Sequence, residues 1–335
     1  MPNKKKNPTI YDVAEFSGVS ISTISRVLNN PEKVNPETRS IVLDAIDKLS
    51  FVPKAEARAR ALSRTNRIGV ITPFFTAPSF VQRLRGAASV LTTSNYELVI
   101  YTVDSFDRLE GYFSSIPFTG HLDGLIVMSL PIQKKDAQRL IAHKLQTVLI
   151  EYSHPELNCI EIDDVQGGLM ATEHLLNKGH RQIAFIGDNE PHDFELHPAG
   201  MRLKGFRQAM KNAGLSVPNE HICLVENTQS DAMRAAHELL SLPTPPTAIF
   251  AAADAQALSV LKVAREMGVK VPDQLAVIGF DDIDSAQFMD LTTIRQQLDE
   301  SGKLAAEILL AHLADASRPA QHVNLPLQLI ERKTT

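Results

Sequence analysis

The chain has 335 residues, 44% of them hydrophobic, which is enough for two or three domains with sizeable cores. It contains no run of 18 apolar residues, which argues against a membrane span. The formal net charge of −5 argues against nucleic-acid binding, but residues 1–66 hold eleven Lys and Arg against seven Asp and Glu, so this segment is +4 and the remainder −9. A basic head on an acidic body fits local attraction of the head to phosphates.

The first nine residues, MPNKKKNPT, are charged and lack an apolar segment, so we expect no secretory signal and a cytoplasmic protein. Lys4 to Lys6 would form an arm that adds nonspecific attraction to DNA. Cys159 and Cys223 lie far apart and form no CxxC pattern. We interpret them as inert thiols rather than as a disulfide or a metal site.

Residues 9–29, TIYDVAEFSGVSISTISRVLN, predict two short helices joined by a tight turn. Thr9 and Asp12 form a capping box for the first helix, Gly18 ends it in the left-handed conformation, and Ser20 caps the second. The second helix would bury Ile24, Val27 and Leu28 and would present only hydrogen-bonding groups on its other side, Ser22, Ser25, Arg26 and Asn29. Such a helix is typical of the recognition helix of a helix-turn-helix, with an ordinary helical hairpin as the alternative.

A third helix is predicted to begin at Asn35, as the cap, and Pro36, as the first helical residue. It closes a small headpiece that ends near Pro53. Residues 54–65, KAEARARALSRT, have good helix propensity but little apolar surface to bury. We therefore expect a linker that is helical only when it is docked.

From Arg67 onward, strands are predicted to alternate with helices. The strands are mostly continuous apolar runs, as expected for parallel strands covered on both faces. Two successive blocks of this kind predict two doubly wound subdomains. The expected strands are 67–73, 96–103, 122–129 and 146–151 in the first block, and 181–187, 221–225, 247–252 and 275–280 in the second.

The motifs of the chain resemble the lactose-repressor/galactose-repressor family of bacterial transcription regulators. They are T-I-Y-D-V-A, G-V-S, T-I-S-R-V-L-N, Phe51-Val52-Pro53, Arg67-Ile68-Gly69-Val70, Ile278-Gly279-Phe280-Asp281-Asp282 and Leu291-Thr292-Thr293-Ile294. The resemblance implies an all-α helix-turn-helix headpiece plus an α/β periplasmic-binding-protein-like core of two doubly wound parallel-sheet subdomains. It also implies crossovers near 165, 297 and 326. The expected parts are a headpiece 1–53, a hinge linker 54–66 and a core 67–331, with subdomain one at 67–165 and 298–325 and subdomain two at 166–297 and 326–331.

Three residues of the second helix are predicted to read bases in the major groove. Ile21 meets a thymine methyl or packs on the headpiece, Ser22 lies in the same first turn, and Arg26 binds a guanine edge or clamps a phosphate. Other polar residues are expected to position the DNA backbone rather than to specify sequence. They are Thr9, Ser20, Thr23, Ser25 and Asn29.

In the family, the linker forms a hinge helix at the dimer axis and wedges a Leu into the minor groove, which bends the DNA. The resemblance places Arg60 where that Leu is typical, whereas Ala57 keeps the small residue of the family and Leu62 is two residues off. An Arg can instead enter a narrowed minor groove electrostatically. Ala57 and Arg60 are therefore the predicted minor-groove residues, and the wedge is not expected to carry over unchanged.

The carboxyl ends of the parallel strands predict a ligand cleft between the subdomains. In the family, positions like Arg202, Asp254 and Asp281 bind effector hydroxyls, usually of a sugar, but Ala253 stands where an Asn is frequent. Pro78, Asp163 and Asp164 are further candidates, and His192 and His197 are expected in a loop near the cleft. For Phe80 the alternative is core packing, and for Asp281 and Asp282 a structural turn. The predicted effector residues are Thr72, Phe74, Phe75, Phe80, Glu151, Arg202, Asp254 and Asp281.

We therefore expect a homodimeric repressor that binds a pseudo-palindromic double-stranded operator and responds to a small-molecule effector, most simply a carbohydrate. A solute-binding protein is the alternative, but it needs export and no DNA-binding head. An enzyme is the third reading, and the sequence lacks a phosphate loop, a G-x-G-x-x-G after a strand, HExxH and G-x-S-x-G. No catalytic residue, cofactor or metal site is predicted. No heptad tail follows Thr335, which favours a dimer over a tetramer.

Overall fold

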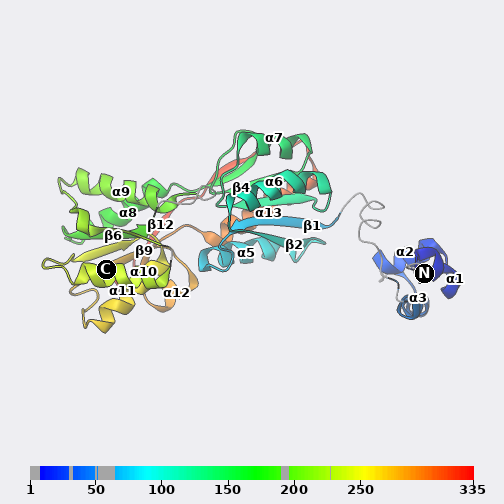
Figure 1. The fold of residues 1–335 in the computed structure, drawn as a ribbon, viewed down its shortest axis with the longest axis horizontal. Helices are drawn as coiled ribbons and strands as arrows, with labels where there is room; N and C mark the ends of the chain where they lie inside the picture. Colours follow the sequence, from blue (N-terminus) through cyan, green and yellow to red (C-terminus); the bar gives the residue numbers. More distant parts are fainter. Residues whose placement is uncertain (1–7, 30–32, 50, 52–64, 190–195, 227) are drawn as a thin grey trace, which may run out of the picture. The chain divides into compact units, whose positions relative to one another are not determined.

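The chain folds into two compact units, Met1–Thr65 and Asn66–Thr335, in a computed structural model (Figure 1). The structure describes residues 8–29, 33–49, 51, 65–189, 196–226 and 228–335. Several residues singled out from the sequence lie outside the described residues. They are Lys4 to Lys6, Ala57, Arg60, Leu62 and His192.

The first unit contains the three predicted helices, α1 (Ile10–Ser17), α2 (Ile21–Asn29) and α3 (Pro36–Leu49). The side-chain amide oxygen of Asn35 accepts from the N–H of Glu37 at 2.9 Å, so the third helix is capped as expected. Apolar side chains from all three helices form one small core. Its buried members are Val13, Ile24, Val27, Val42 and Ala45.

The second unit contains two six-stranded sheets. The first has the order β11-β5-β4-β3-β1-β2, and every pair in it is parallel. Its strands are β1 (Arg67–Pro73), β2 (Glu97–Val103), β3 (Gly124–Met128), β4 (Gln146–Ile150), β5 (Asn158–Glu161) and β11 (His322–Asn324). Its helices are α5 (Pro78–Leu91), α6 (Phe106–Thr119), α7 (Lys134–Ala142) and α13 (Leu298–Ala314).

The second sheet has the order β12-β10-β9-β8-β6-β7. Its pairs are parallel except that β12 runs antiparallel to β10. Its strands are β6 (Ile183–Asp188), β7 (Ile222–Val225), β8 (Ala248–Ala251), β9 (Ala276–Asp281), β10 (Thr292–Arg295) and β12 (Gln328–Ile330). Its helices are α8 (Asp164–Asn177), α9 (Pro198–Asn212), α10 (Gln229–Leu240), α11 (Asp254–Glu266) and the short α12 (Asp284–Phe288), with a 3-10 turn at Asn219–His221.

The central strands are apolar on both faces because helices cover both sides of each sheet. All five residues of β3 and all four of β8 are buried. The chain passes between the sheets after β5, after β10 and between β11 and β12. These passages bring the carboxyl ends of the two sets of parallel strands to one region, where a ligand cavity is expected.

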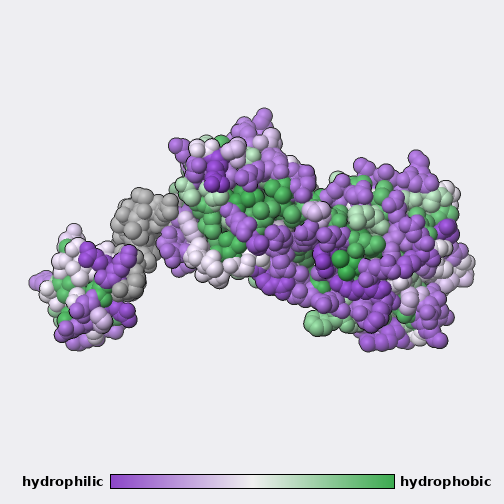
Figure 2. All heavy atoms as spheres, turned by 180° about the vertical axis from the view of Figure 1, so that it is seen from behind, coloured by the Kyte–Doolittle hydropathy of each residue, from purple (hydrophilic) through white to green (hydrophobic). Residues whose placement is uncertain are grey.

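Hydrophilic residues cover much of the face shown in Figure 2, with hydrophobic patches between them. Phe118 and Phe288 are among the large hydrophobic side chains that remain exposed. None of the described helices combines the length and the apolar composition that a membrane span requires.

Candidate functional site

The headpiece begins with a helix whose first turn is fixed by a capping box. The N–H and the hydroxyl of Thr9 both donate to the carboxylate of Asp12, at 2.6 and 2.7 Å. The helix ends at Gly18, whose φ of +68° is the left-handed conformation that favours glycine. The predicted capping box and the predicted left-handed Gly18 are both confirmed. The turn at Gly18 sets the direction in which α2 begins.

Helix α2 buries one side and presents the other to solvent. Ile24 and Val27 are buried in the headpiece core, whereas Ile21, Ser22 and Arg26 are exposed. Ile21 is 39% exposed, so it is not absorbed by the headpiece core. The three residues predicted to read bases are therefore accessible to a partner, and their base contacts stay a prediction.

The predicted backbone-contacting residues lie around the same helix. The hydroxyl of Ser20 accepts from the N–H of Thr23 at 3.3 Å and lies 2.9 Å from the hydroxyls of Ser22 and Thr23. Thr9 and Ser20 are exposed, whereas Thr23 and Ser25 are half-buried. Asn29 ends α2, and its side chain is outside the described set.

Two exposed aromatic side chains of α1 were not predicted as site residues. Tyr11 is 69% exposed, and Phe16 is exposed with the Nζ of Lys48 at 5.9 Å from its ring centroid. An amphipathic Tyr on the surface of a small basic unit is a further group that can reach DNA. The sequence signal was weak because an aromatic residue in a short helix usually indicates core packing.

The second unit holds a cavity of about 590 Å³ at the carboxyl ends of strands from both sheets. Its walls come from β1, α5 and β4 on one side and from β6, α9 and β9 on the other. Six of the eight predicted effector residues line it. They are Phe74, Phe75, Phe80, Glu151, Arg202 and Asp281.

The other two predicted effector residues, Thr72 and Asp254, do not line this cavity. Both are fully buried. The hydroxyl of Thr72 donates to the carbonyl oxygen of Pro73 at 2.9 Å within the chain segment that ends β1. The carboxylate of Asp254 accepts from the N–H of Ile283 at 2.9 Å and from the hydroxyl of Thr293 at 2.6 Å. Asp254 therefore joins α11 to the segments beside it.

The residues next to Asp254 and Asp281 differ in whether they line the cavity. Ala253 lines the cavity and offers only a methyl group there. Asp281 faces the cavity, but Asp282 turns away and pairs with Arg295 and Arg332, at 2.7 and 2.6 Å. Asp282 therefore has a structural role, whereas an effector contact of Asp281 stays a prediction.

Two arginines are set at the cavity by close packing of helices. An ideal Cβ on Gly302 of α13 would lie 1.8 Å from the carbonyl oxygen of Arg83 in α5. One on Gly168 of α8 would lie 2.1 Å from the carbonyl oxygen of Arg202 in α9. Only glycine permits these approaches, so each arginine is fixed at its backbone by a glycine of the neighbouring helix.

The two arginines belong to one buried polar network. Arg83 is 2% exposed and donates from Nη2 to Glu151 and, at 2.9 Å, to the side-chain oxygen of Gln296. Gln296 in turn donates to Asp281. Arg202 lies 3.7 Å from that carboxylate. The network therefore runs from the first sheet to the second through Gln296.

Arg202 completes the far end of the network. Its Nε donates to Asp164 at 2.8 Å and its Nη1 to the carbonyl oxygen of Ala252 at 2.7 Å. Its guanidinium also lies 3.7 Å from the ring centroid of Phe280. Asp164 does not line the cavity, and neither do the other secondary candidates, Asp163 and Pro78.

Burial changes the acidity of the carboxylates in this region. It raises the pKa of Asp281 to about 6, against the opposing effect of the Arg202 and Arg83 charges. It also raises the pKa of Asp254 well above its ordinary value, with the nearby charge of Asp281 as a second cause. The floor of the cavity thus holds a carboxylate that can gain a proton under mildly acidic conditions.

Aromatic side chains form the apolar part of the wall. The rings of Phe74 and Phe80 meet edge to face with centroids 6.5 Å apart, and Arg83 lies 5.7 Å from the centroid of Phe80. Phe74 and Phe75 line the cavity and are 47% and 40% exposed. Such faces can pack against the C–H groups of a ring-shaped ligand.

Sequence reasoning missed several polar lining residues. The expectation for His197 is met, since it lines the cavity just before α9. The missed residues follow strands of both sheets or lie in neighbouring helices, and most are common surface types without a motif. They are Ser79, Arg83, Asp104, Ser129, Asp188, Asn189, Glu226, Thr228 and Gln296.

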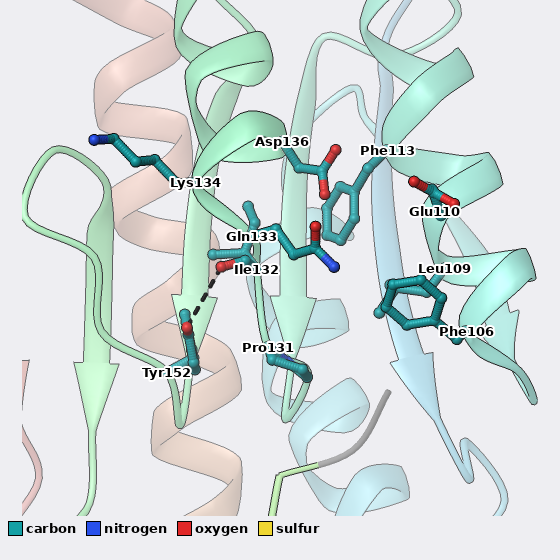
Figure 3. Close-up of a pocket in the computed structure, with 10 residues that line it drawn as sticks. All are labelled: Phe106, Leu109, Glu110, Phe113, Pro131, Ile132, Gln133, Lys134, Asp136 and Tyr152. Atoms are coloured by element: carbon teal, nitrogen blue, oxygen red, sulfur yellow. Dashed lines mark hydrogen bonds between the residues drawn. The ribbon is translucent and has the colours of Figure 1, made fainter. Parts of the chain in front are cut away.

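A second cavity of about 420 Å³ lies beside the first sheet (Figure 3). Phe106 and Phe113 of α6 form one side, and Pro131 and Tyr152 come from the loops after β3 and β4. The hydroxyl of Tyr152 donates to the carbonyl oxygen of Ile132 at 3.4 Å. No residue predicted from the sequence as an effector contact lines this cavity.

Each of the two compact units matches a known protein family model. Residues 9–54 match the model of bacterial regulatory proteins of the lacI family, and residues 172–335 match a periplasmic binding protein-like domain. The chain is 32% identical to the HTH-type transcriptional repressor PurR of Photobacterium profundum over 332 residues, covering 97% of this chain and 98% of the relative. It is equally similar, with the same coverage, to the ribose operon repressor of Escherichia coli.

A solved structure of the transcriptional regulator CelR in complex with cellobiose is similar across the whole chain. It has a TM-score of 0.69 and 27% sequence identity, and the match covers 98% of this chain and all of the other. The helix-turn-helix unit and the two-sheet unit thus occur together in this order in the relatives. The chain belongs to the lacI family of bacterial regulatory proteins.

Proposed function

We propose that this protein is a transcriptional repressor whose affinity for operator DNA is controlled by a carbohydrate bound in the 590 Å³ cavity. The observation that carries the proposal is the pairing, in one chain, of an exposed polar helix face on α2 with a polar cavity shared by two sheets. The helix face suits readout of a major groove, and the cavity suits a small hydroxyl-rich ligand.

The effector class is argued from the cavity walls. Carboxylates and guanidinium groups form charge-assisted hydrogen bonds with hydroxyls, and Phe74 and Phe75 offer faces to a sugar ring. Two similar proteins have names or titles that refer to sugars, the ribose operon repressor and the cellobiose complex of CelR. We propose six contacts, from Phe74, Phe75, Phe80, Glu151, Arg202 and Asp281.

In the headpiece we propose Ile21, Ser22 and Arg26 as base-reading residues, because all three are exposed on one helix. The backbone would be held by Thr9, Ser20, Thr23, Ser25 and Asn29. Two headpieces, one from each subunit of a homodimer, would bind the two halves of a pseudo-palindromic operator in the cytoplasm. Ala57 and Arg60 would contact the minor groove between the half-sites.

Two assays on the full chain test the proposal. In vitro selection of DNA identifies the operator, and a thermal-shift screen of sugars identifies the effector, because a ligand that binds the folded state raises its melting temperature. Arg202→Ala and Asp281→Ala should each remove the sugar-dependent shift while operator affinity without sugar stays within about twofold. A retained shift in both variants would exclude these residues from the site.

A further inference from the structure

The cavity is lined by more acidic than basic side chains. Among the described residues, five carboxylates line it, those of Asp104, Glu151, Asp188, Glu226 and Asp281. Only two guanidinium groups and no ammonium group line it among the described residues. Leaving His197 aside, the described lining residues therefore carry an excess of three negative charges, which repels an anionic ligand.

Both cationic groups are already compensated by the protein. Arg83 is held by Glu151 and by the side-chain oxygen of Gln296. Arg202 is held by Asp164 at 2.8 Å and lies 3.7 Å from Asp281. A phosphate or carboxylate that entered the cavity would have to displace a buried carboxylate from one of these pairs, since neither guanidinium is free.

Two polar atoms of the lining have unmet hydrogen bonds. The Nε of Arg83 and the Nε2 of His197 are buried and have no partner within the described part of the chain. Arg83 belongs to α5 beside the first sheet, whereas His197 precedes α9 beside the second. One such buried, unpartnered nitrogen therefore lies in a lining residue on each side of the cavity.

Hydroxyl groups match this mixture of donors and acceptors. A hydroxyl accepts from an N–H and also donates to a carboxylate, whereas an ionised phosphate oxygen or carboxylate only accepts. The Nε–H of Arg83 has no acceptor in the described part of the chain, and the carboxylate oxygens on the cavity wall have lone pairs that can accept further hydrogen bonds. An uncharged polyol can supply both an acceptor and donors.

We propose that this cavity selects uncharged polyols and rejects sugar phosphates and sugar acids, with the Arg83–Glu151 ion pair as the element that rejects anions. The inference rests on the proposed function, because it takes the effector to be bound in this cavity. It adds a charge class for the ligand and assigns Arg83 a role in setting ligand specificity.

The first experiment uses matched ligands on the wild-type protein. Thermal shifts are measured with D-ribose against D-ribose 5-phosphate, and with D-glucose against D-glucose 6-phosphate and D-gluconate. Each anionic member should shift the melting temperature less than its neutral counterpart does. An anion that stabilises the protein more than its neutral counterpart, and whose effect is lost in Arg202→Ala, would overturn the proposal.

The second experiment frees the buried guanidinium. Glu151→Gln leaves Arg83 without its carboxylate partner, so the affinity for the anionic ligand relative to the neutral one should rise at least tenfold. Glu226→Gln is the matched control, because it removes a lining carboxylate that is exposed and pairs with no arginine in the described structure. That control should keep rejecting anions. An equal gain in relative affinity for the anion in both variants would show that the total charge of the lining, and not the Arg83–Glu151 pair, excludes anions.

The outcomes separate this inference from the proposed function. If no sugar of either class binds while the protein still binds its selected operator, the carbohydrate effector is wrong, and the selection of neutral polyols falls with it. If neutral and anionic members bind the wild type equally well, the carbohydrate effector stands and the charge selection is wrong. The panel on the wild type decides these cases even if Glu151→Gln fails to fold.

Discussion

Arg26 is the residue on which sequence readout by the headpiece depends most. It is exposed on α2, on the side opposite the buried Ile24. A guanidinium can bind a guanine edge through two hydrogen bonds, which makes it more discriminating than the nearby hydroxyls. Arg26→Ala should therefore cost about 1–3 kcal/mol of operator binding and relax the preference at one base pair. Affinity measurements on a set of single-base operator variants test this, and a uniform loss on every sequence would make Arg26 a phosphate contact.

Asp281 predicts a specific pH dependence of stability. Its folded-state pKa of about 6 lies above the ordinary value of 3.8, so the folded chain holds this proton more tightly than the unfolded chain. The stability from this proton is fully present below about pH 4 and is lost as the pH rises to about 6. Asp281→Asn removes the titration. The melting temperature of the wild type relative to this variant should therefore rise as the pH falls from 7 to 4, whereas a constant difference would contradict the raised pKa.

Residues next to strand ends were easier to predict than residues further along a helix. Phe74, Glu151 and Asp281 follow or end their strands, and the rule for parallel sheets placed them correctly at the cavity. Asp254 obeys the same rule, but hydrogen bonds with Ile283 and Thr293 turn it away. Arg83 was missed because it lies inside α5, and its direction depends on tertiary packing that the sequence does not contain.

At the scale of elements, eight strands were predicted, and β5, β10, β11 and β12 were not. Length alone does not explain the difference, because β7 and β8 also have only four residues and were predicted. The positions of the four missed strands depend on pairing with distant segments, as when β12 runs antiparallel to β10. The alternation of strands and helices that defines the two doubly wound sheets is visible in the other eight strands.

The close contact between α5 and α13 supplies a prediction at this scale. Gly302→Ala would place a methyl carbon against the carbonyl oxygen of Arg83, so the helices must separate. We expect a loss of roughly 1–3 kcal/mol in the free energy of unfolding, measured by urea denaturation. Gly111→Ala in α6 is the control, because its added carbon meets no atom within 4 Å. If both variants unfold alike, the packing of α5 on α13 does not constrain Arg83.

The linker predicts a salt-dependent contribution to DNA binding, argued from the sequence because Arg60 lies outside the described residues. An Arg in a narrowed minor groove neutralises phosphate charge, so Arg60→Ala should weaken operator binding and lower the slope of affinity against salt. Arg60→Leu should increase bending at a flexible central step. Unchanged affinity and slope in Arg60→Ala would mean that Arg60 faces solvent, and Arg60→Lys serves as a control that keeps the charge.

At the scale of the whole molecule, the proposed function couples the exposed helix α2 of one compact unit to a ligand cavity in the other. A ligand can change operator affinity only if it binds the operator-competent and the operator-incompetent forms with different affinities. The network from Arg83 through Gln296 and Asp281 to Arg202 spans both sheets, so it is the part of the molecule where a bound ligand can bias their arrangement.

The most direct test is the affinity for the selected operator, measured by fluorescence anisotropy with and without the sugar that gives the largest thermal shift. The account predicts that this sugar changes the operator affinity of the wild type at least tenfold and that of Arg202→Ala by less than twofold. A wild-type affinity that stays the same at saturating sugar would contradict the claim that the cavity controls DNA binding.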